Sequence, residues 1–405
     1  MSVAALASAL GVEKVILHEP MVMEGAKLEA TLRPESGEAL AETLRALSAA
    51  QIPALLRGGG SRLATANAPC RARALLDTSA LGFEPELDAE EGVMRCSAGS
   101  RLSALRERLA GSGWELPLDP PGPGATLGGT LATAAVGPCY ALPRDNVLGL
   151  GVVLADGDRI RCGGRVVKNV TGYDLAKLFV GSFGSYGVIE WAWLRLRPAP
   201  EAARVMLAPG EIEWARALQA ARRPSVRAAA LADAGLVSAK SIERCLVLEL
   251  AGDAAAVAAD AAWLEAECGA CEADAAALEE VRAAQGAGPL RIRIAALPSE
   301  LPAAADALRE AGGQLLSHPA RGLAWARFPL SGPEDEAGVD GALAAATRAA
   351  ARTSGSRRIE QAPVGARVGR EVFGGADASL SLERALKEQY DPARILNPGR
   401  FVGGL

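Results

Sequence analysis

Three glycine-rich segments in the first 190 residues constrain this chain more than any other feature of its sequence. The first covers residues 58–61 and directly follows the apolar run at residues 54–56. The second covers residues 118–133, and the third joins residues 168–175 to residues 180–189. Glycines let consecutive backbone N–H groups point into one concavity, which binds phosphate. One such segment is explained equally well by a turn, but three in this order indicate a ligand site.

The segments match neither of the two common nucleotide-binding motifs. A G-x-x-x-x-G-K-[ST] loop is absent, and no strand–G-x-G-x-x-G–helix unit occurs. The surrounding pattern predicts a helix at residues 36–50, where Ser36 is the cap and Leu40, Leu44 and Leu47 share one face. It also predicts strands at residues 54–56, 74–77 and 93–96, a helix containing Leu102, Leu105 and Leu109, and a hairpin at residues 147–162.

The mixture of strands, helices and hairpins predicts an α+β fold rather than a regular doubly wound sheet. Beyond residue 200 the chain is alanine-rich, with strand-like runs at residues 246–250 and 291–294. We expect a loop at residues 331–341 and a last helix at residues 380–390. The predicted organisation is an N-terminal extension (1–24), a domain that carries the glycine-rich segments (25–200), a smaller α+β domain (201–365) and a C-terminal helix and tail (366–405).

Composition excludes several classes of function. The net charge of −5 gives no reason to expect nucleic-acid binding, which usually requires a basic patch, and no run approaches the roughly 18 apolar residues of a membrane span. The N-terminus lacks the features of a secretory signal, so we expect a soluble cytoplasmic protein. We interpret the pair Cys268 and Cys271 as small residues of a helix, because no second pair or histidine lies nearby. We therefore expect no metal site in a chain with only two histidines.

The order of the glycine-rich segments resembles the FAD-binding domain typified by vanillyl-alcohol oxidase and p-cresol methylhydroxylase. The resemblance is greatest to the FAD-binding E subunit of bacterial glycolate oxidase (glycolate dehydrogenase). It covers residues 25–200 and 380–401. The stretches that carry it are residues 126–129, 163–175, 187–189 and 390–400.

The resemblance implies which residues hold the cofactor. The first loop has no histidine of the kind that attaches FAD in some relatives, so FAD is expected to bind non-covalently. Arg62 departs from the small polar residue common at its position. The implied FAD-binding residues are Gly58, Gly59, Gly60, Ser61, Pro120, Thr126, Gly128, Gly129, Thr133, Gly172, Gly181, Gly184, Val188, Ile189 and, returning from the end of the chain, Asn397.

The resemblance also implies an oxidoreductase role with partner chains. We expect an FAD-binding subunit that carries electrons in a 2-hydroxy-acid dehydrogenase such as glycolate dehydrogenase, with a catalytic flavin subunit and an iron–sulfur subunit. In such a complex, the partner subunits would allow this chain to lie peripherally at the inner membrane. Catalytic residues are not identified by the sequence, and the candidates are Arg293 and His318.

Three alternatives stay open. The first is a self-sufficient D-lactate or glycolate dehydrogenase in which Arg293, Arg327 or Arg358 clamps the carboxylate. The second is an assembly subunit without a working flavin, and the third is a sugar-nucleotide reductase of the same fold.

Overall fold

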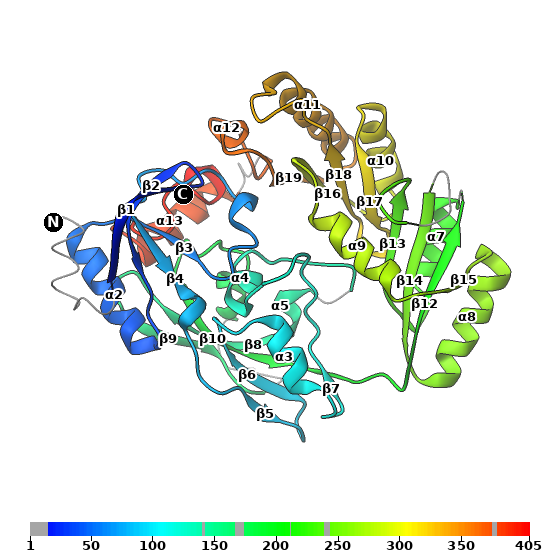
Figure 1. Ribbon diagram of the computed structural model, residues 1–405, viewed down its shortest axis with the longest axis horizontal. Coiled ribbons are helices and arrows are strands. Elements are labelled where there is room, and N and C mark those ends of the chain that lie inside the picture. Colours follow the sequence, from blue (N-terminus) through cyan, green and yellow to red (C-terminus); the bar gives the residue numbers. More distant parts are fainter. Residues whose placement is uncertain (1–14, 140–141, 167–173, 211, 239–243, 375–378) are drawn as a thin grey trace.

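The computed structural model describes residues 15–139, 142–166, 174–210, 212–238, 244–374 and 379–405. Figure 1 shows two lobes. The first contains residues up to about 200 together with the C-terminal helix, and the second contains the intervening residues. No helix in these ranges is long and apolar enough to cross a membrane.

The first lobe begins with a four-stranded sheet of order β1-β2-β4-β3. β2 runs antiparallel to β1 and parallel to β4, which is parallel to β3. β1 falls within the segment expected as an N-terminal extension, and it forms the edge of this sheet. The strands are β1 (Val15–Met23), β2 (Ala26–Leu32), β3 (Ala54–Arg57) and β4 (Ala74–Asp77).

Helix α2 (Gly37–Ala50) covers this sheet, as the sequence pattern predicts. The Ser36 hydroxyl accepts a hydrogen bond from the Ala39 N–H at 3.2 Å and caps the helix. Leu40, Leu44 and Leu47 are fully buried, and each stabilises the packing by roughly 1.5–3 kcal/mol.

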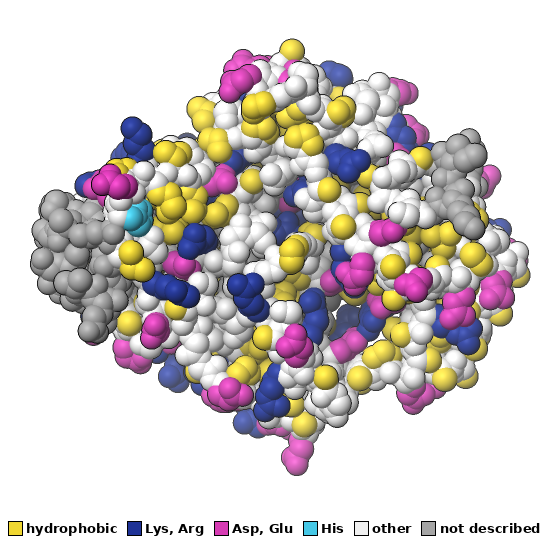
Figure 2. Space-filling model, in the orientation of Figure 1, with side chains coloured by type: hydrophobic (Ala, Val, Ile, Leu, Met, Phe, Trp, Pro, Cys, Tyr) yellow, Lys and Arg dark blue, Asp and Glu magenta, His cyan; other side chains and the backbone are white. Residues whose placement is uncertain are grey.

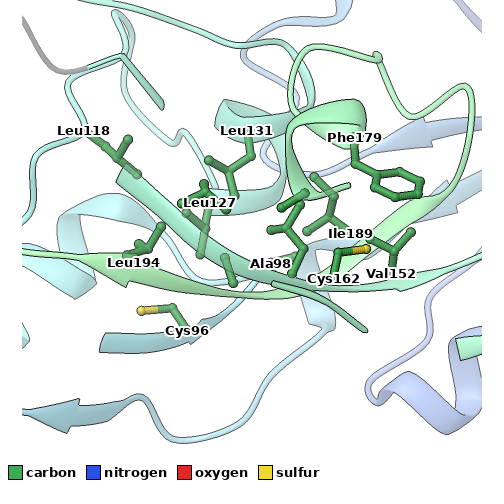
Figure 3. Packing of buried hydrophobic residues seen from close by; sticks show 14 of the residues in the cluster. Cys96, Ala98, Leu118, Leu127, Leu131, Val152, Cys162, Phe179, Ile189 and Leu194 are labelled. Carbon is green, nitrogen blue, oxygen red and sulfur yellow. The ribbon is translucent and has the colours of Figure 1, made fainter. Parts of the chain in front are cut away.

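A five-stranded antiparallel sheet of order β5-β6-β10-β8-β9 forms the second part of this lobe. Its predicted hairpin is present, since β8 pairs with β9. Figure 3 shows leucines of the 118–131 region packed with β10 and Phe179 in its core. The strands are β5 (Glu86–Asp88), β6 (Val93–Ser97), β8 (Val147–Val153), β9 (Arg159–Gly163) and β10 (Val188–Arg195), with a small pair, β7 (Trp114–Glu115) and β11 (Arg197–Pro198). The helices are α3 (Leu102–Leu109), α4 (Leu127–Ala132), α5 (Pro143–Asn146) and α6 (Ala176–Phe179).

The second lobe is built on an eight-stranded antiparallel sheet of order β15-β12-β14-β13-β17-β18-β16-β19. Helices α7, α8, α10 and α11 bury one face of the sheet. The opposite face packs against α9 and turns toward the first lobe, where Cys139 forms a β-bridge with Ala228.

The elements of the second lobe have the following bounds. The strands are β12 (Ala202–Pro209), β13 (Val226–Asp233), β14 (Arg244–Gly252), β15 (Cys271–Ala273), β16 (Leu290–Ala295), β17 (Gln314–His318), β18 (Leu323–Phe328) and β19 (Ser356–Gln361). The helices are α7 (Trp214–Ala221), α8 (Ala254–Cys268), α9 (Ala276–Gly286), α10 (Leu301–Glu310), α11 (Glu336–Arg352) and α12 (Val364–Arg367).

Two local predictions are wrong. The expected loop at residues 331–341 ends early, because the Asp335 side chain accepts from the Gly338 N–H and caps α11. The stretch with Cys268 and Cys271 is not one helix. α8 ends at Cys268, where Gly269 adopts a φ of 61°, and Cys271 begins β15.

The C-terminal helix α13 (Leu380–Tyr390) and its tail return to the first lobe. The buried Lys387 ammonium donates to the Asp391 carboxylate at 2.7 Å, to the Leu396 carbonyl at 2.8 Å and to the Ser185 carbonyl at 2.9 Å. The tail then lies alongside β3, where the Ala54 N–H donates to the carbonyl of Ile395. All three ammonium protons are therefore used to fix the tail.

Replacing Lys387 with methionine is expected to lower the free energy of unfolding by about 3–5 kcal/mol, because the Asp391 carboxylate stays buried without its partner. The matched control is Lys177→Met, which removes an exposed pair with Asp174 and is expected to cost less than about 1 kcal/mol. Urea denaturation of both variants measures the difference. Equal losses would contradict a stabilising role for the buried ammonium.

Candidate cofactor-binding site

A pocket lies where β3, α4, the loop before β10 and the C-terminal tail meet. Most of the residues that the sequence assigns to the cofactor line this one pocket, although they are spread over 340 positions of the chain. These residues are Gly58, Gly59, Gly60, Ser61, Thr126, Gly128, Gly129, Thr133, Gly184, Val188, Ile189 and Asn397.

Thr126 joins the first glycine-rich segment to the second. Its hydroxyl accepts from the Gly59 N–H at 3.3 Å and from the Gly129 N–H at 3.4 Å, which also caps α4. A Cβ on Gly58 would lie 2.4 Å from the Thr126 hydroxyl oxygen, and one on Gly59 would lie 1.9 Å from the Gly124 carbonyl. Both positions therefore require glycine so that the two segments can approach.

Asn397, which lies near the end of the chain, connects the first and third glycine-rich segments. Its side-chain oxygen accepts from the Leu56 N–H at 2.8 Å, and its side-chain nitrogen donates to the Phe183 carbonyl at 2.6 Å. Both contacts come from one buried amide held at a φ of 46°. The side chain thus holds both sides of the pocket at a fixed separation.

The exposed donors of the first loop fit a pyrophosphate. In the described part of the chain, no hydrogen bond engages the backbone N–H of Gly60 or Ser61. The Arg62 side chain lines the same pocket, and its Nε and one Nη are buried without a hydrogen-bond partner. Free amides beside a guanidinium suit a doubly charged phosphate group.

Arg62 also connects the pocket to the second lobe. Its guanidinium lies 3.7 Å from the Glu360 carboxylate, which accepts from Arg358 at 2.6 Å and lies 3.4 Å from Arg293. Burial alone would raise the pKa of Glu360, but the three positive charges outweigh it and lower that pKa to about 2. Burial lowers the pKa of Arg62 and Arg293 to about 10, so both stay charged at neutral pH.

The two candidates for substrate chemistry, Arg293 and His318, lie on the same face of the eight-stranded sheet. Arg293 pairs with Trp325 across β16 and β18, and the His318 ring lies 4.8 Å from the Trp325 ring. His318 is fully buried, and neither ring nitrogen has a hydrogen-bond partner. Burial, and secondarily the charge of Arg321, lower the pKa of His318 to about 3.

Two of the described residues implied by the resemblance, Pro120 and Gly181, are not brought into the pocket. Pro120 lines a separate pocket of about 950 Å³, together with Asp119 and Arg282. Gly181 lies outside both pockets, and its N–H donates to the Leu131 carbonyl at 2.9 Å. Gly172 lies outside the described residues. No group of three or more His, Cys, Asp or Glu in the described ranges is placed to hold a metal.

Sequence reasoning missed Glu360 and treated Arg62 only as a departure from a common pattern. A signal was present in β19, where the charged residues Arg358 and Glu360 flank the buried Ile359. That alternation shows that the charges face away from the helix-covered side. It does not show that they meet a loop 300 residues earlier.

The sequence profile of a family described as "FAD binding domain" matches residues 28–163. This chain carries an FAD-binding domain. The match includes the first two glycine-rich segments and most of the five-stranded sheet, in agreement with the geometry of the pocket.

Curated relatives match less than half of the chain. The D-lactate dehydrogenase of Archaeoglobus fulgidus is 36% identical over 181 residues, which cover 44% of this chain and 41% of that protein. The glycolate oxidase subunit GlcD of Bacillus subtilis is 32% identical over 184 residues, covering 44% of this chain and 39% of that protein. The matches thus span about two fifths of these relatives' length.

Solved structures match the whole fold. p-Cresol methylhydroxylase aligns with a TM-score of 0.72 at 15% identity, covering 98% of this chain and 95% of that chain. The 4-ethylphenol oxidase of Gulosibacter chungangensis aligns with a TM-score of 0.73 at 15% identity, covering 98% and 96%. At this identity the likeness shows the fold, which confirms the predicted two-domain α+β architecture.

Gly129→Asp is expected to weaken FAD binding by more than about tenfold, because a carboxylate would enter the pocket beside the first glycine-rich loop. Gly332→Asp is the control, since nothing lies within 4 Å of that position. FAD is measured in the supernatant after acid precipitation of each purified protein. Equal flavin release from both variants would contradict the site, and flavin retained in the precipitate would contradict non-covalent binding.

The buried His318 predicts a loss of stability in mild acid. Its pKa in the folded state is about 3, below the value near 6.5 of an unfolded histidine. The unfolded chain therefore takes up a proton as pH falls below about 6.5, and the folded chain does not. Between pH 7 and pH 5 this lowers the free energy of unfolding by about 2 kcal/mol. Urea denaturation at both pH values should show a smaller loss in His318→Leu, and an equal loss would contradict the assignment.

Proposed function

We propose that this chain is the FAD-binding subunit of a multi-subunit 2-hydroxy-acid dehydrogenase, with glycolate as the first candidate substrate. Its partners would be a catalytic flavin subunit and an iron–sulfur subunit. The observation that carries the proposal is one pocket built from all three glycine-rich segments, with a buried group of arginines at its edge. Bound FAD supplies redox chemistry, and the protein supplies binding and orientation.

The names of the relatives support the substrate class and the assembly. D-lactate and glycolate are both 2-hydroxy acids, and the matched Bacillus protein is named as a subunit. A D-2-hydroxyglutarate dehydrogenase of Danio rerio matches over 43% of this chain. We propose a cytoplasmic location, with attachment to the inner membrane through partner subunits.

The state of His318 supports a division of labour between subunits. A general base works best when its pKa lies near the operating pH. With a pKa of about 3, His318 takes up a proton poorly at neutral pH. In the proposed complex, the catalytic flavin subunit removes the hydroxyl proton of the substrate.

A self-sufficient 2-hydroxy-acid dehydrogenase is the second candidate. It is favoured by Arg293 and Arg358, which lie side by side on β16 and β19 near the pocket and suit a carboxylate. Arg327 is directed elsewhere, because it donates to the Gln314 side chain at 2.6 Å.

The test is steady-state oxidation of glycolate and D-lactate with a dye acceptor. It is performed first with the lone FAD-loaded chain and then with the complex co-purified from the native host. We expect turnover by the complex at least about a hundredfold faster than by the lone chain, the usual lower bound for a positioned base. Fast turnover by the lone chain, lost in Arg293→Gln, would establish the self-sufficient enzyme instead. A colourless chain would indicate an assembly subunit, and NADPH oxidation a sugar-nucleotide reductase.

A further inference from the structure

We propose that Arg400, in the C-terminal tail, acts together with Arg62 to hold the pyrophosphate of FAD, so that cofactor binding and docking of the tail stabilise each other. The inference deepens the cofactor part of the proposed function. It depends on the FAD pocket alone and not on the substrate or on partner subunits.

The Arg400 guanidinium lies against the segment that follows the first glycine-rich loop. It donates to the Leu63 carbonyl at 2.7 Å and to the Asn67 carbonyl at 3.2 Å. In return, the Asn67 backbone N–H donates to the Arg400 carbonyl at 3.2 Å, and the Asn67 side chain donates to the Phe401 carbonyl at 2.7 Å. These hydrogen bonds clasp the tail to the loop region and place Arg400 in the lining of the FAD pocket.

The positive charge of Arg400 is buried without a carboxylate of its own. Only 4% of the residue is exposed, and its Nε has no hydrogen-bond partner in the described structure. Its other donors reach carbonyl groups, and the nearby Glu24 carboxylate is paired with Arg367 instead. Burial lowers the pKa of Arg400 to about 10, so the group stays charged at neutral pH. A buried charge is costly unless a counter-charge compensates it, and an anion in the pocket would do so.

The pocket offers two such arginines. Three arginines line it, and one of them, Arg57, is neutralised by Asp77 at 2.6 Å. Arg62 lies 3.7 Å from Glu360, but this carboxylate is shared with two arginines of the second lobe. Arg62 and Arg400 therefore provide two incompletely compensated positive charges, and the pyrophosphate of FAD carries two negative charges. Charge-assisted hydrogen bonds from arginine to phosphate are among the strong ones in proteins.

The surface supports the approach of an anionic cofactor. Figure 2 shows several Lys and Arg side chains around the hollow between the two lobes. Like charges that line a concavity raise the local concentration of an oppositely charged ligand. FAD that enters from this side therefore meets positive charge before it reaches the pocket.

The position of Arg400 in the tail couples cofactor binding to docking of the tail. Arg400 and Asn397 both line the pocket, and both belong to the segment of residues 391–405. FAD gains the contact with Arg400 only when this segment is docked. A ligand that prefers one state stabilises that state, and the coupling is reciprocal. Bound FAD is therefore expected to hold the tail in place.

The first experiment measures the dissociation constant of FAD for the full chain by flavin fluorescence. Arg400→Gln is expected to raise it about tenfold to a hundredfold, the usual effect of losing a hydrogen bond to a charged group. Arg400→Lys should recover most of the loss, because an ammonium keeps the point charge that binds phosphate. Arg394→Gln is the matched control, since Arg394 lies in the same tail but is half exposed and faces Glu388. It should leave the affinity unchanged.

Asn67→Ala separates the cofactor contact from a purely structural role of Arg400. This change removes the bond to Phe401 and so loosens the same clasp, but it removes no charge from the pocket. We expect lower stability in urea and a much smaller loss of FAD affinity than in Arg400→Gln. Equal losses of affinity in the two variants would overturn the proposal, as would a lysine that restores nothing.

The second experiment compares hydrogen exchange of tail peptides with and without FAD. We expect FAD to slow exchange in residues 391–405 by at least about tenfold in the unchanged chain and in Arg394→Gln, and much less in Arg400→Gln. Exchange that does not respond to FAD would contradict the coupling. Neither experiment needs turnover or partner subunits, so failure of the dehydrogenase function would leave both results unaffected.

Discussion

The buried ammonium of Lys387 is the interaction on which the pocket depends most. Its three hydrogen bonds bring together α13, the C-terminal tail and the loop before β10. They leave Asn397 at the point where its side chain reaches both Leu56 and Phe183. The tail that closes the cofactor pocket is therefore fixed in part by a contact outside the pocket itself.

An electrostatic contact between Arg62 and Glu360 joins the two lobes at the edge of the pocket. The Glu360 carboxylate is on the second lobe, and Arg62 belongs to the loop of the first lobe that carries the free amides. A carboxylate surrounded by arginines keeps its charge even when buried. The first glycine-rich loop is thus tied to the eight-stranded sheet of the second lobe, and the Arg62–Glu360 pair lies at the edge of the pocket.

Much of this arrangement could be predicted from the sequence because it depends on local patterns. The helix capped by Ser36 and the hairpin around Asp156 follow from capping and turn chemistry acting over a few residues. The glycines of the pocket could be predicted because their segments stand out in the sequence and their order resembles an FAD-binding domain, whereas the approach of Gly59 to Gly124 joins segments far apart in the chain. Glu360 could not be found in this way, since its role depends on strand register in one lobe and on a loop in the other. The boundary at Asp335 was missed because two glycines in the first turns of α11 hid its helical pattern.

The two sides of the pocket lie far apart in the sequence, which also sets an order of events during biosynthesis. Leu56 and Asn397, which share a hydrogen bond, are 341 positions apart. At about 5–20 residues per second, a ribosome needs roughly 20–70 seconds to extend the chain from one to the other. The first glycine-rich loop therefore emerges from the ribosome before Asn397 is made, and it lacks this partner while the second lobe is synthesised. A nascent chain interrupted before residue 397 therefore lacks one side of the pocket, which is completed only after the second lobe has been made.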